Sequence, residues 1–137
     1  MAAPHRLSPD DIEATLVPRI RAIADQVASR HTDLSVFVEA GPSRQDGYVV
    51  AISCILPDRE RDEPDLLDLE IRFEGLGSQP MLACADVVWG HPSGHLEAEL
   101  HRRPRPVDDA IWADLLEALP RLTDALEAGL RRGRPPA

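Results

Sequence analysis

A histidine- and glutamate-rich segment at residues 90–101 (GHPSGHLEAELH) holds the side chains best suited to binding a metal ion. Its second half alternates apolar and polar residues, which is typical of a half-buried strand. If Leu96, Ala98 and Leu100 face the core, the polar residues share the outer face, roughly 6.5–7 Å apart along the strand. Imidazole and carboxylate groups at such spacing suit zinc and related divalent ions. The metal-site hypothesis rests on His91, His95, Glu97, Glu99 and His101.

The same pattern is also typical of a solvated strand face on which histidine and glutamate pair weakly. A metal site commonly takes ligands from a second element, and the sequence identifies none. We therefore keep metal or small-ligand binding, with or without catalysis, as the alternative function. No cofactor motif is present, and we expect no cofactor.

Other catalytic chemistry has less support in the sequence. Ser93 is one place out of the Gly-x-Ser-x-Gly pattern and lies between two expected strands, where that motif requires a strand and then a helix. Cys54 and Cys84 lie in apolar stretches, which predicts free, buried thiols that stay neutral. Residues 75–78 (GLGS) lack the lysine and the following helix of a phosphate loop. The sequence therefore favours a protein that is not an enzyme, and we predict no catalytic residue.

The strongest charge feature is an acidic segment from residue 58 to residue 74. Eight acidic residues stand there against three arginines, in a chain of net charge −9. Such a segment can steer and hold a basic protein, or mimic nucleic acid; it is equally typical of a solvated loop. The partner-binding residues expected on this ground are Asp58, Glu60, Asp62, Glu63, Asp65, Asp68 and Glu70.

Asp86 is a lone carboxylate in the otherwise apolar stretch 81–89. A buried carboxylate needs partners or a raised pKa, so such a residue can mark a site. It can equally face solvent, or pair with an arginine such as Arg72. The sequence leaves these alternatives open.

The elements that must position these side chains follow from the apolar periodicity. A helix is predicted from the N-cap Ser8 to about Arg30, with a kink or break near Thr15–Val17 because Pro18 removes a backbone donor. Five strands are then expected at residues 34–40, 48–56, 67–73, 81–89 and 96–100. A final helix starts at Asp108 or Asp109 and ends near residue 130, with Pro120 inside it.

Short turns between successive strands favour an antiparallel meander, because a parallel crossover needs a dozen or more residues. The predicted fold is α+β: a helix, a five-stranded, mainly antiparallel meander sheet, and a second helix, with both helices packed on the sheet. The second and fourth strands are apolar on both faces, however. Either one helix covers each face, or an open face pairs with a second copy or with another protein.

Length and composition limit the remaining classes. A chain of 137 residues that is 43% apolar fits a single domain, with a core at about residues 8–130 and a disordered tail at 131–137. No apolar run approaches the roughly 20 residues of a membrane span, and the N-terminus lacks a secretory pattern, so we expect a cytoplasmic protein. All 15 basic residues are arginine and none is lysine, which indicates a GC-rich bacterial genome. The acidic balance argues against direct nucleic-acid binding.

These observations favour a non-enzymatic, acidic protein-binding module of the inhibitor, immunity or chaperone kind. Its expected partner is a basic protein, bound through the acidic segment or an open sheet face. A homodimer through the open face is the other expected assembly.

Overall fold

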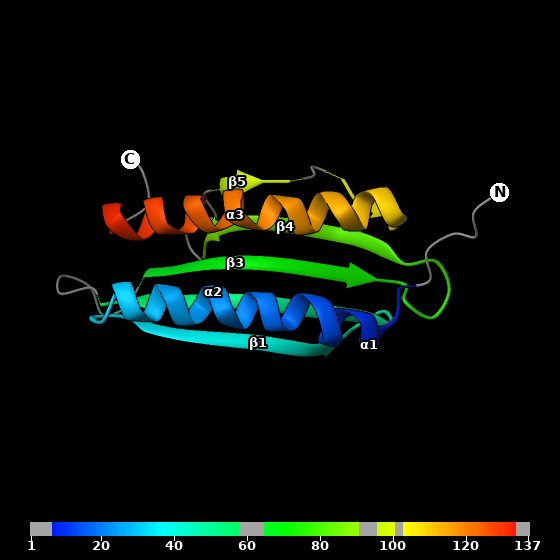
Figure 1. Cartoon of the computed structure of the whole chain (residues 1–137), viewed down its shortest axis with the longest axis horizontal. Helices are drawn as coiled ribbons and strands as arrows, with labels where there is room; N and C mark the ends of the chain where they lie inside the picture. The colour runs from blue at the N-terminus through cyan, green and yellow to red at the C-terminus, as the bar shows by residue number, and fades with distance from the viewer. Residues whose placement is uncertain (1–6, 58–64, 91–95, 101–102, 134–137) are drawn as a thin grey trace.

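The computed structural model of the chain describes residues 7–57, 65–90, 96–100 and 103–133 (Figure 1). It confirms the α+β class: a helical segment, an antiparallel sheet and a C-terminal helix follow one another along the chain. The elements are α1 (Pro9–Asp11), the π-helical turn η1 (Ile12–Leu16), α2 (Val17–Arg30), β1 (Ser35–Ser43), β2 (Gly47–Leu56), β3 (Asp65–Glu74), β4 (Met81–Trp89), β5 (Leu96–Glu99), β6 (Arg105–Pro106) and α3 (Asp109–Arg132).

The sheet has the predicted meander order, β1-β2-β3-β4-β5, with every neighbouring pair antiparallel. The two-residue strand β6, which the sequence did not predict, pairs with β4. The first hairpin is tighter than expected, because the turn occupies only residues 44–46. Gln45 and Asp46 adopt left-handed φ values of 61° and 51° there. A Cβ atom at Gly47 would lie 2.6 Å from the carbonyl oxygen of Phe73, so only glycine fits.

The N-terminal helical segment begins and breaks where the sequence predicts. Ser8 forms a capping box with Asp11, which satisfies free backbone donors at the helix start. The N–H of Val17 then bonds to the carbonyl of Ile12, five residues back, and this widens the turn just before Pro18. Because Pro18 has no N–H to donate, the helix is irregular on its N-terminal side and regular from Val17 onward.

Helix α3 extends further than expected. Asp108 caps it by accepting a 2.7 Å hydrogen bond from the N–H of Ile111. The helix ends at Arg132, followed by Gly133 at a left-handed φ of 76°. The expected disordered tail therefore does not begin at residue 131; residues 134–137 lie outside the described residues.

Both helices cover the same face of the sheet (Figure 1). Tyr48 donates a 3.0 Å hydrogen bond to Glu13 in the N-terminal helical segment. Its cross-strand neighbour Phe73 packs against Trp112 of α3, with ring centroids 6.1 Å apart. Directly opposed residues share a face, so the alternative with one helix on each face is wrong.

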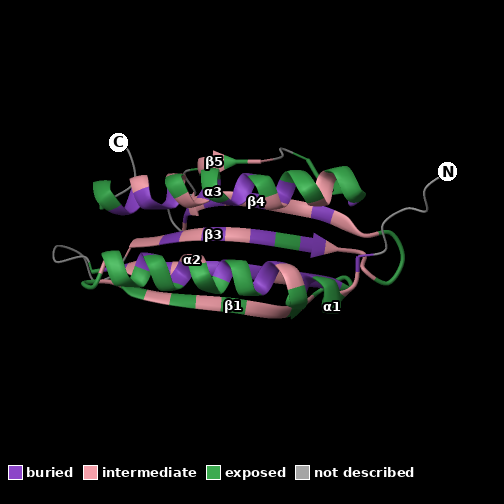
Figure 2. Ribbon diagram, in the orientation of Figure 1, coloured by how far each residue is buried: buried purple, intermediate pink, exposed green. Residues whose placement is uncertain are grey.

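The core lies between the two helices and this covered face. Alternate residues of β3 point into it, which produces the banding of that strand in Figure 2. The fully buried side chains include Leu16, Ile20, Val27, Ile52, Leu67, Leu69, Ile71, Phe73, Leu82, Val87, Trp89, Leu115, Leu122 and Leu126. In the described part of the chain, no helix is long and apolar enough to cross a membrane.

Gly129 sets how closely α3 approaches the sheet. A Cβ atom there would lie 2.7 Å from Leu67 Cδ2 and 3.5 Å from Trp89 Cζ2. The residue is buried inside the helix, which continues to Arg132 and so passes the end near residue 130 that the sequence predicted. Close contact with β3 and β4 therefore explains a glycine at a position where alanine would favour the helix by about 1 kcal/mol.

We expect Gly129→Val to destabilise the fold by about 1–3 kcal/mol, because the added isopropyl group overpacks a filled core. Urea denaturation followed by circular dichroism measures the change. The control is Ala113→Val, at an exposed position of the same helix, which should cost only about 0.5 kcal/mol through helix propensity. Equal losses in the two variants would show that the contact with Leu67 does not limit the packing of α3.

Candidate functional site

The side of the sheet opposite the helices, here called the open face, carries a line of carboxylates across the strands. Strand register places Glu39, Ala51, Glu70, Asp86 and Glu99 directly opposite one another on β1 to β5. We call the four carboxylates of this line the acid row. Because neighbouring strands lie about 4.8 Å apart, the row spans about 19 Å. Its four carboxylates come from four different strands, so it has no counterpart as a motif along the sequence.

A second line, next to the acid row, combines apolar and polar residues. Its members, here called the mixed row, are Phe37, Ser53, Asp68, Val88 and Leu96. Phe37 and Leu96 stand at its two ends with exposed fractions of 56% and 43%, and they are the exposed large hydrophobic residues of the described part of the chain. The open face therefore joins exposed apolar area to negative charge.

Asp86 is the most perturbed carboxylate of the acid row. Burial raises its pKa to about 6, and the negative charges of Glu70 and Glu99 add to this, while Arg72 acts in the opposite direction. Its Oδ1 atom is buried and has no hydrogen-bond partner among the described residues. Like charges directly opposite each other on neighbouring strands are unfavourable, so Glu70 and Glu99 both oppose the ionisation of Asp86.

Asp68 of the mixed row is perturbed in the same direction. Burial raises its pKa, and a hydrogen bond from Ser53 partly offsets this. Its Oδ1 is likewise buried without a partner in the described part of the chain. Asp86 and Asp68, on adjacent rows, therefore each have one buried carboxylate oxygen without a hydrogen-bond donor among the described residues.

The nearest positive charge on the open face is already engaged. The guanidinium of Arg72 bonds to Glu70 on its own strand, β3. Both side chains also line a shallow hollow of about 380 Å³ at one end of the acid row, together with Glu39, Ser43, Arg44, Gln45, Val49 and Glu74. Arg72 is therefore paired with Glu70, and its charge only partly offsets the rise in the pKa of Asp86.

Ligand atoms of Glu70, Cys84 and Asp86 lie within 4.8 Å of one another, a spacing that a metal ion could bridge. Burial and the charge of Asp86 raise the pKa of Cys84 to about 12, so its thiol is neutral at pH 7. A metal ion bound there would have to displace the proton of the Cys84 thiol and share Glu70 with the guanidinium of Arg72.

The two cysteines are free, as predicted, but they occupy opposite faces of the sheet. Cys54 is fully buried on the helix side, and burial raises its pKa to about 12. Cys84 is only partly buried and pairs across the strands with Arg72 on the open face. The expectation that both thiols belong to the core is therefore wrong for Cys84.

The acidic segment predicted from the sequence is divided by the fold. Asp68 and Glu70 lie on the open face, whereas Asp65 begins β3 opposite the buried Leu56. The other predicted residues, Asp58, Glu60, Asp62 and Glu63, lie outside the described residues. Sequence analysis missed Glu39, because only strand register brings it into line with Glu70.

The predicted histidine–glutamate cluster is only partly described, since His91, His95 and His101 lie outside the described residues. Glu97 accepts a 2.6 Å hydrogen bond from Trp89 Nε1 and pairs with Arg132 of α3, which places it on the helix side. Glu99 lies opposite Asp86 on the open face. The expectation that these two glutamates share the outer face is therefore wrong.

A register shift between Val87 and Val88 explains this outcome. One extra residue on β5, Glu97, breaks the alternation that the sequence pattern implies. Leu96 consequently lies opposite Val88 and is exposed, although the sequence pattern predicted it to face the core.

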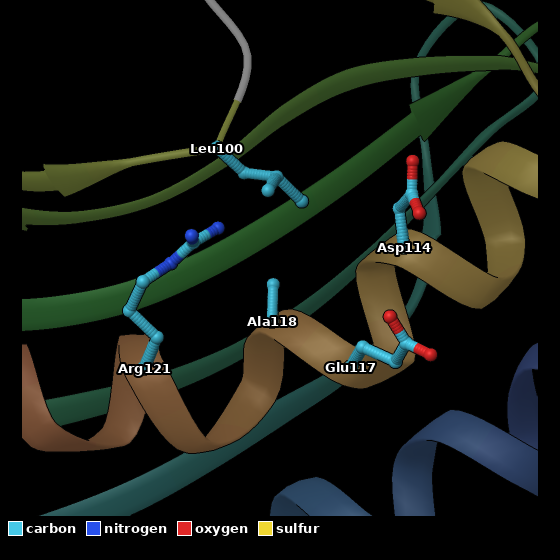
Figure 3. Close-up of a pocket in the computed structure, with 5 residues that line it drawn as sticks. All are labelled: Leu100, Asp114, Glu117, Ala118 and Arg121. Atoms are coloured by element: carbon cyan, nitrogen blue, oxygen red, sulfur yellow. The ribbon is translucent and has the colours of Figure 1, made fainter.

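The helix side offers a contrasting acidic surface. A hollow of about 380 Å³ lies between Leu100 and α3, and Asp114, Glu117, Ala118 and Arg121 line it (Figure 3). Asp114 and Glu117 are both exposed. They provide matched carboxylates against which the acid row can be tested.

Together, the fold and the open face define an α+β protein with one sheet face covered by helices and the other partly apolar and acidic. Comparison with protein-family models, curated proteins and solved structures finds no match to this chain. The open face therefore supplies the observations from which a function can be inferred.

We expect Asp86→Asn to stabilise the protein at pH 7 by about 1–2 kcal/mol. Its pKa rises from 3.8 to about 6 on folding, so the folded state binds more protons and stability falls as pH rises between these values. Each pKa unit is worth about 1.4 kcal/mol, and partial exposure of the side chain reduces the total.

Urea denaturation at pH 4 and pH 7 measures this effect. At pH 4 the folded protein holds Asp86 largely protonated, so the gain should nearly vanish. Asp114→Asn, at an exposed position, should stay within about 0.5 kcal/mol of the parent at both pH values. A gain of the same size at both pH values would show that the ionised carboxylate is not the source of the instability.

Proposed function

We propose that this chain is a non-enzymatic protein-binding module that binds a basic partner on its open face. The observation that carries the proposal is Asp86: it is partly buried, its pKa is raised to about 6, and one oxygen is without a partner among the described residues. The free protein thus maintains an unfavourable charge at the centre of an uncovered surface. Perturbed groups of this kind cluster at functional sites.

A cationic side chain from a partner would relieve this strain. An arginine or lysine placed over Asp86 would also be close to Glu70 and Glu99, because the three carboxylates are neighbours in one row. Hydrogen bonds between charged groups are about twice as strong as neutral ones. Phe37, Val88 and Leu96 would contribute apolar contact beside the charged line, which supports affinity as well as steering.

A heterologous basic partner is favoured over a second copy of the chain. In a symmetric pair of open faces whose two-fold axis runs along the acid row or crosses it at right angles, the acid row of one copy would meet the acid row of the other. Arg72, the arginine closest to the centre of the row, is already paired with Glu70. Charge complementarity therefore supports a different protein whose contacting surface is basic.

Metal binding through residues 91–101 stays a separate hypothesis. The described part of that segment gives it no support, because Glu97 is already bonded to Trp89 and Arg132. We therefore do not place the function there.

The proposal is tested with two double variants of equal charge change. Glu70→Gln/Asp86→Asn alters the acid row, and Asp114→Asn/Glu117→Gln alters the helix side. Each serves as bait in native lysate at low and moderate salt, and the affinity of any stoichiometric partner is then measured by calorimetry. We expect the acid-row variant to bind about tenfold or more weakly, the helix-side variant to bind normally, and binding to weaken as salt rises.

Equal binding by both variants would exclude the open face as the docking surface. A partner whose affinity does not change with salt would exclude charge complementarity as its basis. Circular dichroism confirms that each variant is folded before binding is measured.

A further inference from the structure

We infer that the partner element seated on the open face is a basic, amphipathic α-helix lying across the strands. This inference rests on the proposed function and names the kind of partner.

The two rows require an element that presents two kinds of side chain to one surface. The acid row and the mixed row run side by side across the strands, two residues and so roughly 6.5–7 Å apart. An α-helix with its side chains is about 10–12 Å across, so one side of it reaches both rows. Basic residues on one part of that side would face the acid row, and apolar residues on the other would face Phe37, Val88 and Leu96.

Backbone hydrogen bonding excludes an extended peptide across this face. The backbone groups of the central strands are used in ladders with their neighbours on both sides. A peptide strand laid over the face would cover its own N–H and C=O groups without partners, which is costly. A helix satisfies these groups internally, so it can lie on a finished sheet.

The length of the acid row fits a helix of ordinary size. Measured from Glu39, the carboxylates of Glu70, Asp86 and Glu99 stand at roughly 10, 14 and 19 Å across the sheet. Helix positions i+7, i+11 and i+14 lie on one side of a helix at about 10.5, 16.5 and 21 Å from position i. Arginine side chains are long enough to absorb the differences of about 2 Å.

The probe is a fluorescein-labelled peptide of about 18 residues, which spans about 27 Å as a helix. It carries arginine at positions i, i+7, i+11 and i+14, leucine at i+1, i+5, i+8 and i+12, and alanine or glutamine elsewhere. A permuted peptide of identical composition has no amphipathic face, and a third has two central residues replaced by proline. Fluorescence anisotropy measures binding of each peptide to the full chain, and circular dichroism measures helix gained on binding.

We expect the amphipathic peptide to bind about tenfold or more tightly than the permuted and proline peptides, and to gain helix on binding. Glu70→Gln/Asp86→Asn should weaken its binding about tenfold, and Leu96→Ala should weaken it several-fold, because Leu96 belongs to the mixed row. Asp114→Asn/Glu117→Gln should leave the affinity unchanged.

The outcomes separate this inference from the proposed function. If the permuted peptide binds equally well and still requires Glu70 and Asp86, the inference of a helix is overturned, and the proposal that the acidic open face binds a basic partner stands. The same conclusion follows if no peptide binds while the native partner depends on the acid row, as it would for a partner that docks a sheet or loops. If peptide binding is insensitive to the acid-row variants, the open face is not the site of the peptide and the inference of a helix fails. The proposed function fails only if the native partner also binds the acid-row variant normally.

Discussion

The fold depends on one constraint: a sheet has two faces, and the described chain supplies helices for only one. The helical segments flank the strands in sequence, and both pack on the face that carries Tyr48, Phe73 and Trp89. Burial of that face supplies the core, so the other face must be compatible with water without covering helices. Charged residues at the open-face positions of β3, Asp68, Glu70 and Arg72, meet this requirement, where a continuous apolar surface would promote aggregation.

Solubility alone does not explain the way these charges are arranged. Alternating signs across neighbouring strands would hydrate the face equally well and would add cross-strand attraction. Instead, Asp86 stands between Glu70 and Glu99, where burial and repulsion raise its pKa to about 6. Natural proteins retain such local instability where function requires it, and ion pairing at the site would remove it.

The sequence predicts the elements of this protein much better than it predicts the site. Helix caps at Ser8 and Asp108 and the period-two strands depend on local chemistry, which a single sequence displays. The acid row depends on which residues lie opposite one another, and this follows from hairpin length and from one bulge near Val87. A single extra residue on β5 moves Glu97 to the helix side, and no periodicity reveals it in advance.

Under the proposed function, the combination of acid row and mixed row would also govern which partners are rejected. A two-fold axis running along the acid row, or crossing it at right angles in the plane of the face, brings carboxylates of one copy opposite carboxylates of the other. Exposed Phe37 and Leu96 would otherwise favour self-association, so the neighbouring charges oppose the assembly that those side chains promote. A basic partner would be attracted by the same charges. Under the proposed function, the apolar area would therefore contribute to affinity, and the acid row would restrict binding to basic surfaces.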